Sequence, residues 1–131
     1  ALVAKAGDTI SFTPSQQAQA DILLDKFKTA PYYPPDVTEA KATVGEELLQ
    51  GMIAHQDLVQ VGDQILFTPA VVEEMTSWVK NYLLEYGTLT LAEFRDHFQT
   101  SRKYAVAVLE YLDEKGVTKR KGDARVLNRI K

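Results

Sequence analysis

Residues 58–69 have the sequence LVQVGDQILFTP, and residues 2–14 have the related sequence LVAKAGDTISFTP. Each segment places two short runs of β-prone residues around a Gly-Asp pair and ends with Phe-Thr-Pro. Because glycine readily adopts the backbone angles of a tight reversal, this pattern is typical of a β-hairpin. A looser third copy, VTKRKGDARVL, occupies residues 117–127. The shared Phe-Thr-Pro favours a true internal repeat over unrelated hairpins.

Helical patterns fill the intervals between these hairpins. In the first interval, apolar residues recur at helical spacing over residues 20–27 and 48–53, on either side of a proline-rich break at 31–35. Asp36 and Glu39 have the spacing of a capping pair, which predicts that a short helix begins between these stripes.

The second interval repeats this plan. Its apolar residues predict a long helix over residues 72–86, and Thr90 with Glu93 predicts a capping box that opens the next helix. We expect Thr100 to cap a third helix, whose apolar stripe runs through residues 105–112.

Helices followed by a hairpin give the order of a winged helix, a helix-turn-helix variant in which the hairpin is the wing. We therefore predict a mainly α fold with small β-hairpins (α+β), built as tandem winged-helix domains. Residues 14–68 would form one domain and residues 69–131 the next, because Pro69 suits the first turn of a helix. Residues 1–13 would be the wing of a preceding domain.

The composition excludes several classes of site. The 131 residues are 45% hydrophobic and include no cysteine, which rules out disulfides and thiolate chemistry and fits a cytoplasmic protein. His55 and His97 are isolated, so no metal site is expected. Phosphate-loop, nucleophile-elbow and zinc-protease motifs do not occur, nor does an apolar run long enough to cross a membrane. We expect a monomeric, non-enzymatic protein.

The charge distribution is strongly asymmetric. Residues 1–98 carry 6 Lys or Arg and 14 Asp or Glu, a net of −8, whereas residues 99–131 carry 9 and 4, a net of +5. A basic end on an acidic chain favours a polyanionic partner, although a solvated basic surface would have the same composition.

The first basic group lies at the predicted start of the last helix. Arg102 and Lys103 add cations to the positive end of the helix dipole, which is unfavourable unless an anion such as phosphate binds there. A tolerated surface pair is the alternative. Ser101 could donate to a phosphate or simply start the helix, and Tyr104 is the best candidate for stacking on a base.

The second basic group lies on the last hairpin. Strand alternation would send Lys119 and Lys121 to one face and Arg120 to the other, with Arg125 across the turn. Since the wing and the helix start are neighbours in a winged helix, both groups could line one groove. Protection of an edge strand by lysines is the alternative.

These residues resemble the last winged-helix domain of bacterial selenocysteine-specific elongation factors. The resemblance rests on SRKY at 101–104, LEYLD at 109–113, TKR at 118–120 and GD at 122–123. It implies binding of an mRNA hairpin, the selenocysteine insertion element, beside a recoded UGA codon. Carried over to this sequence, the RNA contacts fall on Ser101, Arg102, Lys103, Tyr104, Lys119, Arg120 and Arg125, to which the wing cluster adds Lys121.

The resemblance also implies a larger protein around this chain. Such factors use GTP and Mg²⁺ in an N-terminal part and carry selenocysteinyl-tRNA to the ribosome, whereas no cofactor is expected within these residues. Many relatives have a second arginine at the position of Lys119. A lysine acts as a point charge, so we do not expect it to donate two hydrogen bonds to one base or phosphate. The acidic residues 14–68 would then act as a spacer that repels RNA.

Two other functions fit the same fold. A DNA-binding transcription regulator would need polar, base-reading side chains along the third helix, where this chain has Ala105, Val106, Ala107 and Val108. A protein-interaction module would show no salt-sensitive affinity for RNA.

Overall fold

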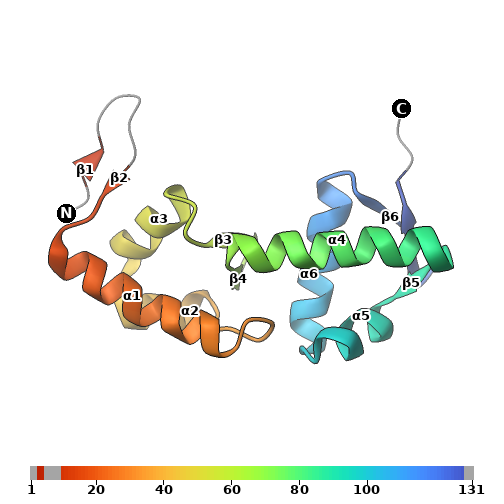
Figure 1. Ribbon diagram of the computed structural model, residues 1–131, viewed down its shortest axis with the longest axis horizontal. Coiled ribbons are helices and arrows are strands. Elements are labelled where there is room, and N and C mark those ends of the chain that lie inside the picture. Colours follow the sequence, from red (N-terminus) through yellow and green to blue (C-terminus); the bar gives the residue numbers. More distant parts are fainter. Residues whose placement is uncertain (1–2, 5–9, 129–131) are drawn as a thin grey trace. The chain divides into compact units, whose positions relative to one another are not determined.

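The computed structural model describes residues 3–4 and 10–128. The chain forms two compact units, residues 1–69 and 70–131, which are described separately (Figure 1). The Gly7-Asp8 turn of the first hairpin, and most of the expected wing at 1–13, lie outside the described residues. The elements of the first unit are β1 Val3–Ala4, β2 Ile10–Ser11, α1 Pro14–Thr29, α2 Val37–Val44, α3 Glu46–Ala54, β3 Val59–Gly62 and β4 Ile65–Phe67.

Local capping explains where the helices of the first unit begin. The N–H of Gln16 donates to the Thr13 hydroxyl and the Gln16 side chain returns to the Thr13 N–H, while Pro14 occupies the first turn of α1. Asp36 and Glu39 make the same reciprocal bonds at the start of α2, as predicted. These paired bonds satisfy amide protons that a bare helix end would leave open.

The core of the first unit is a cluster of apolar side chains from all its described helices, from Leu58 just before β3 and from Leu66 in β4. The hairpin itself pairs antiparallel, with an irregular register between Gln60 and Gly62. The Val37 N–H also donates to the Gln64 carbonyl, which joins α2 to the hairpin turn. Buried members of the cluster are Ala20, Leu23, Phe27, Val37, Ala40, Val44, Leu48, Leu49, Met52, Leu58 and Leu66.

The second unit has the same order with one added strand. Figure 1 shows α6 running across α4. The sequence predicted a two-stranded wing, but the structure forms a three-stranded sheet in the order β5-β7-β6, because the short segment before α5 pairs with β7. The elements are α4 Pro69–Tyr86, β5 Leu89–Thr90, α5 Leu91–Phe98, α6 Arg102–Glu114, β6 Thr118–Lys121 and β7 Ala124–Leu127.

The turn between α5 and α6 positions the basic helix start. Thr90 and Glu93 form the predicted capping box at the beginning of α5. The same Glu93 carboxylate accepts from the Tyr82 hydroxyl at 2.7 Å. The hydrogen bond from the Thr90 N–H lowers the pKa of Glu93 most, and the bond from the Tyr82 hydroxyl lowers it further. The carboxylate therefore stays charged at the helix start. Gln99, with φ of +53°, then turns the chain from α5 into α6.

The mainly α fold with small β-hairpins is thus confirmed. Within the described residues, none of the helices is both long and apolar enough to traverse a lipid bilayer.

We predict that Leu112→Ala destabilises the second unit by about 2–5 kcal/mol, because it leaves a cavity in a packed core. Leu112 is 1% exposed, whereas Leu84, a leucine in the same unit, is 69% exposed. Leu84→Ala is the matched control and should change stability by no more than about 0.5 kcal/mol. Urea unfolding followed by fluorescence of Trp78, the only tryptophan, measures both. Equal losses for the two variants would contradict the described core.

Candidate nucleic-acid interface

The start of α6 is capped by Ser101. Its hydroxyl accepts from the Tyr104 N–H at 3.2 Å, which is the bond expected of an N-cap residue. The expectation that Thr100 caps this helix is therefore wrong by one residue. The Thr100 N–H instead donates to the Arg95 carbonyl at the end of α5. The helix-start role of Ser101, one of the two roles open from sequence, is the one that the geometry supports.

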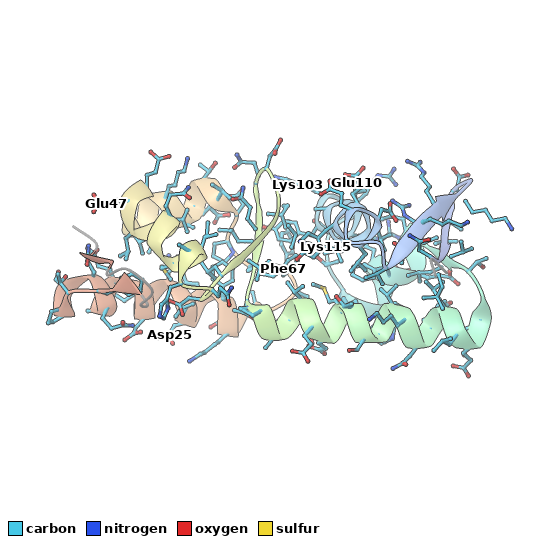
Figure 2. The ribbon with its side chains drawn as sticks, turned by 90° about the horizontal axis from the view of Figure 1, so that it is seen from above. Asp25, Glu47, Phe67, Lys103, Glu110 and Lys115 are labelled. Carbon is cyan, nitrogen blue, oxygen red and sulfur yellow. The ribbon has the colours of Figure 1, made fainter. Side chains whose placement is uncertain are left out.

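Arg102 and Lys103 occupy the first turn of α6, and both are exposed. That turn contains no acidic residue, so nothing within it offsets the cations placed on the positive end of the helix dipole. Figure 2, in which α6 is seen almost end-on, labels Lys103 and Glu110 along the same side of this helix. The carboxylate at position 110 therefore lies about two turns along from the cations.

A hollow of about 350 Å³ lies between α6 and the wing. Arg102 and Arg120 both line it, so the structure brings together the two basic groups that the sequence placed 18 positions apart. The full lining is Leu91 from the start of α5, Arg102, Val106, Leu109 and Glu110 from α6, and Arg120, Asp123 and Arg125 from the wing.

The wing presents its cations as strand alternation predicts. Lys119, Arg120 and Lys121 are all exposed, but only Arg120 of the three lines the hollow. Its Nε donates to the Gly122 carbonyl at 3.2 Å, which holds the base of the guanidinium against the turn of the hairpin. Lys119 and Lys121 therefore add positive charge outside the hollow.

Arg125 is placed differently from the other cations. Its residue is 7% exposed, and its guanidinium forms an ion pair with Asp113, with 3.0 Å between Nη2 and Oδ2. The prediction that Arg125 contacts RNA in the manner of a free surface arginine does not fit this burial, because its charge is already paired within the fold.

Tyr104 also departs from its predicted role. It is 4% exposed and belongs to the buried face of α6 together with Ala105 and Val108. A side chain this deep in the core has no ring face available for stacking on a nucleotide. The sequence placed Tyr104 beside two cations but could not determine which side of the helix it occupies.

Four of the predicted cations take part in no ion pair within the described part of the chain. The ion pairs found among residues 3–4 and 10–128 do not include Arg102, Lys119, Arg120 or Lys121, whereas Arg95 and Arg125 are both paired. Arg102 and Arg120 in the hollow, together with Lys119 and Lys121 on the wing outside it, form a surface suited to an anion. The same described residues contain no group of His, Asp or Glu placed to hold a metal ion.

Sequence reasoning missed the other lining residues. Val106 and Glu110 follow Arg102 at intervals of four along α6, so helical spacing alone could have placed them on its face. Leu91 and Asp123 come from other elements, and no local pattern indicates their position. The two carboxylates, Glu110 and Asp123, add negative charge to the lining of the same hollow.

Comparison with known proteins identifies the second unit. Residues 81–127 match the family model of the winged helix of elongation factor SelB. These residues, which lie in the C-terminal unit, are similar to the SelB winged helix. Two selenocysteine-specific elongation factors align with this chain. That of Desulfomicrobium baculatum is 29% identical over 72 residues, or 55% of this chain, and that of Escherichia coli K12 is 34% identical over 56 residues, or 43% of this chain.

The chain spans only 11% and 9% of the length of these two elongation factors. Among solved structures, the mRNA-binding domain of SelB from E. coli, in complex with SECIS RNA, superposes with a TM-score of 0.67 at 22% identity, covering 89% of this chain and 99% of that one. A bacterial selenocysteine-specific elongation factor superposes with a TM-score of 0.63 at 19% identity, covering 89% of this chain and 19% of that one. At identities below 25%, the superpositions show only that this chain shares the fold of these structures.

We predict that Ser101→Ala lowers the stability of the C-terminal unit by about 1 kcal/mol in the absence of RNA, because the cap of α6 is lost. Ser101→Asp should restore most of the loss, since aspartate also caps helices and its charge suits the dipole. Thermal unfolding of the free protein measures both. Equal stability of the wild type and Ser101→Ala would remove the capping role.

Proposed function

We propose that the C-terminal unit binds an mRNA hairpin, the selenocysteine insertion element, through the surface between α6 and the wing. The observation that carries the proposal is that Arg102 at the start of α6 and Arg120 on the wing line the same hollow. Arginine suits this task because its planar guanidinium donates two hydrogen bonds to a phosphate or a guanine edge. Exposed Lys103, Lys119 and Lys121 extend the positive surface to either side.

The hollow has the properties of a site for an unpaired nucleotide. Val106 and Leu109 give it apolar lining, the arginines give it cationic walls, and Glu110 and Asp123 supply acceptors for the amino groups of a base. Hairpin loops and bulges offer such splayed bases, whereas paired bases are inaccessible in a regular RNA helix. Phosphates would meet the exposed cations at the helix tip and on the wing.

The composition of α6 favours RNA over duplex DNA. A helix that reads the major groove needs polar side chains along its exposed face. Between exposed Lys103 and exposed Glu110, α6 has only buried or half-buried residues. The half-buried pair, Val106 and Ala107, cannot form a hydrogen bond with a base. Contact through the helix tip and wing therefore fits a folded RNA better than a groove-reading mode.

The first unit would act as an acidic spacer. Residues 1–69 contain four Lys or Arg and nine Asp or Glu, a net of −5. A negative surface repels RNA and would concentrate binding on the second unit. By analogy with the longer relatives, the whole protein would use GTP and Mg²⁺ in a separate part and carry selenocysteinyl-tRNA to the ribosome in the cytoplasm. The residues of this chain would tether it near a UGA codon and would themselves have no enzymatic role.

We predict that Arg102→Ala and Arg120→Ala each weaken binding of a selenocysteine insertion hairpin by about 1–3 kcal/mol if each arginine makes a two-bond contact. Lys80→Ala, which removes an exposed cation from α4, is the control and should leave the affinity within about twofold, because isolated exposed charges contribute little. Fluorescence anisotropy of labelled RNA at several salt concentrations measures these effects, and wild-type affinity should fall steeply with salt.

Three outcomes would contradict the proposal. Affinity that does not change with salt would favour a protein-interaction module. Equal competition by a DNA duplex of the same sequence would favour a transcription regulator. Equal effects of Arg102→Ala and Lys80→Ala would indicate diffuse attraction to a charged chain and no defined site.

A further inference from the structure

A partly buried network of polar side chains connects α6 to both wing strands. The Asp113 carboxylate accepts from Arg125 Nε at 3.2 Å through Oδ1 and at 3.0 Å through Oδ2, in addition to the Nη2 contact. The hydroxyl of Thr118, itself 1% exposed, donates to Asp113 Oδ1 at 2.6 Å. One carboxylate on α6 therefore holds one residue of β6 and one of β7.

The position of Asp113 is costly for the helix alone. It lies in the last turn of α6, where the helix dipole is negative and a cation would be favoured, and that turn contains no basic residue. A carboxylate is favourable there only if cations and hydroxyls outside the helix stabilise it. Arg125 and Thr118 do so, which indicates that the residue serves the contact between helix and wing and not the helix itself.

The network also acts on the residues that face the proposed ligand. Arg125 pairs directly across the wing with Arg120, so β7 carries the restraint from Asp113 to the strand that holds the exposed arginine. Arg125 and Arg120 both line the hollow, opposite Arg102. If the pair were broken, the wing would lose its only described ion pair to α6 and Arg120 would lose its fixed place relative to Arg102.

We propose that Asp113 is a positioning residue for RNA binding, which sets the distance between the arginine on α6 and the arginine on the wing by holding Arg125 and Thr118. The inference rests on the proposed function, because it assigns Asp113 a role in the same RNA site. Asp113 acts through Arg120 and does not touch the RNA.

A double-mutant cycle tests this role in the full chain. Asp113→Asn retains the size of the side chain but removes its charge, and should weaken binding of the labelled insertion hairpin by about tenfold. Arg120→Ala should also cost about tenfold in the wild type but less than about twofold in the Asp113→Asn background, since Arg120 is already misplaced there. Lys103→Ala, on the exposed first turn of α6, is the control, and its effect should be the same in both backgrounds.

Two outcomes would overturn the proposal. Tighter binding by Asp113→Asn, with a steeper salt dependence, would mean that Asp113 masks Arg125, which then becomes a new phosphate contact. Full additivity of Asp113→Asn and Arg120→Ala would mean that the network supports the fold without positioning Arg120.

A second variant covers the case in which Asp113→Asn does not fold. Thr118→Val keeps the shape of the side chain and removes only its hydrogen bond, and it should show smaller coupling to Arg120→Ala of the same sign. Backbone amide exchange over residues 118–127 in the free protein should also be faster in either folded variant. That exchange requires no RNA, so unchanged exchange overturns the positioning role by itself. Faster exchange in the variants together with no RNA binding by the wild type overturns the proposed function and, with it, the role of Asp113 in RNA binding.

Discussion

The ion pair between Asp113 and Arg125 is the contact on which the geometry of the basic surface depends. It is buried on the arginine side, where the residue is 7% exposed, and it joins the end of α6 to the middle of the wing. Removing one partner of a fully buried pair typically costs about 3–5 kcal/mol, because the other charge is left without compensation. The cost here should be smaller, because the Asp113 side chain is 26% exposed. A wing held in this way presents Arg120 and Arg102 to one hollow as a single surface.

The charges of α6 are reversed relative to those that would best stabilise an isolated helix. Arg102 and Lys103 lie at its positive end, and Asp113 and Glu114 at its negative end. Each arrangement opposes the helix dipole by up to about 1 kcal/mol. Such departures from local preference are expected where a protein maintains a site. At one end the compensation is the buried pair, and at the other it would be the phosphates of a bound RNA.

Local chemistry made much of the fold predictable. The Gly-Asp hairpins, the helical stripes between them, and the capping pairs of Asp36 with Glu39 and Thr90 with Glu93 all depend on residues a few positions apart. The added strand β5 was not predicted, because two residues carry no pattern and the strand exists only through pairing with β7. The helix cap was misplaced by one residue because two adjacent hydroxyl residues, Thr100 and Ser101, both suit that position.

The positive charge of the candidate site could be predicted from the sequence, but the burial of its individual residues could not. A cluster of cations near a helix start and a wing indicated a surface for an anion, and Arg102 and Arg120 do line one hollow. Whether a given residue faces outward depends on tertiary packing. Tyr104 lies in the core, and Arg125 pairs with a carboxylate 12 positions earlier in the sequence. Neither outcome is visible from composition or spacing, since both need the wing to be folded against α6.

The most direct measurement of the central claim is an NMR titration of the isotope-labelled chain with an unlabelled selenocysteine insertion hairpin. We predict that the amide signals of residues 101–106 and 118–125 shift together with one affinity, because α6 and the wing contact the same ligand. Signals from α1, α2 and α3 should stay unchanged. Shifts centred on residues 14–57, or shifts of the wing and the start of α6 with different affinities, would contradict a single RNA-binding surface between α6 and the wing.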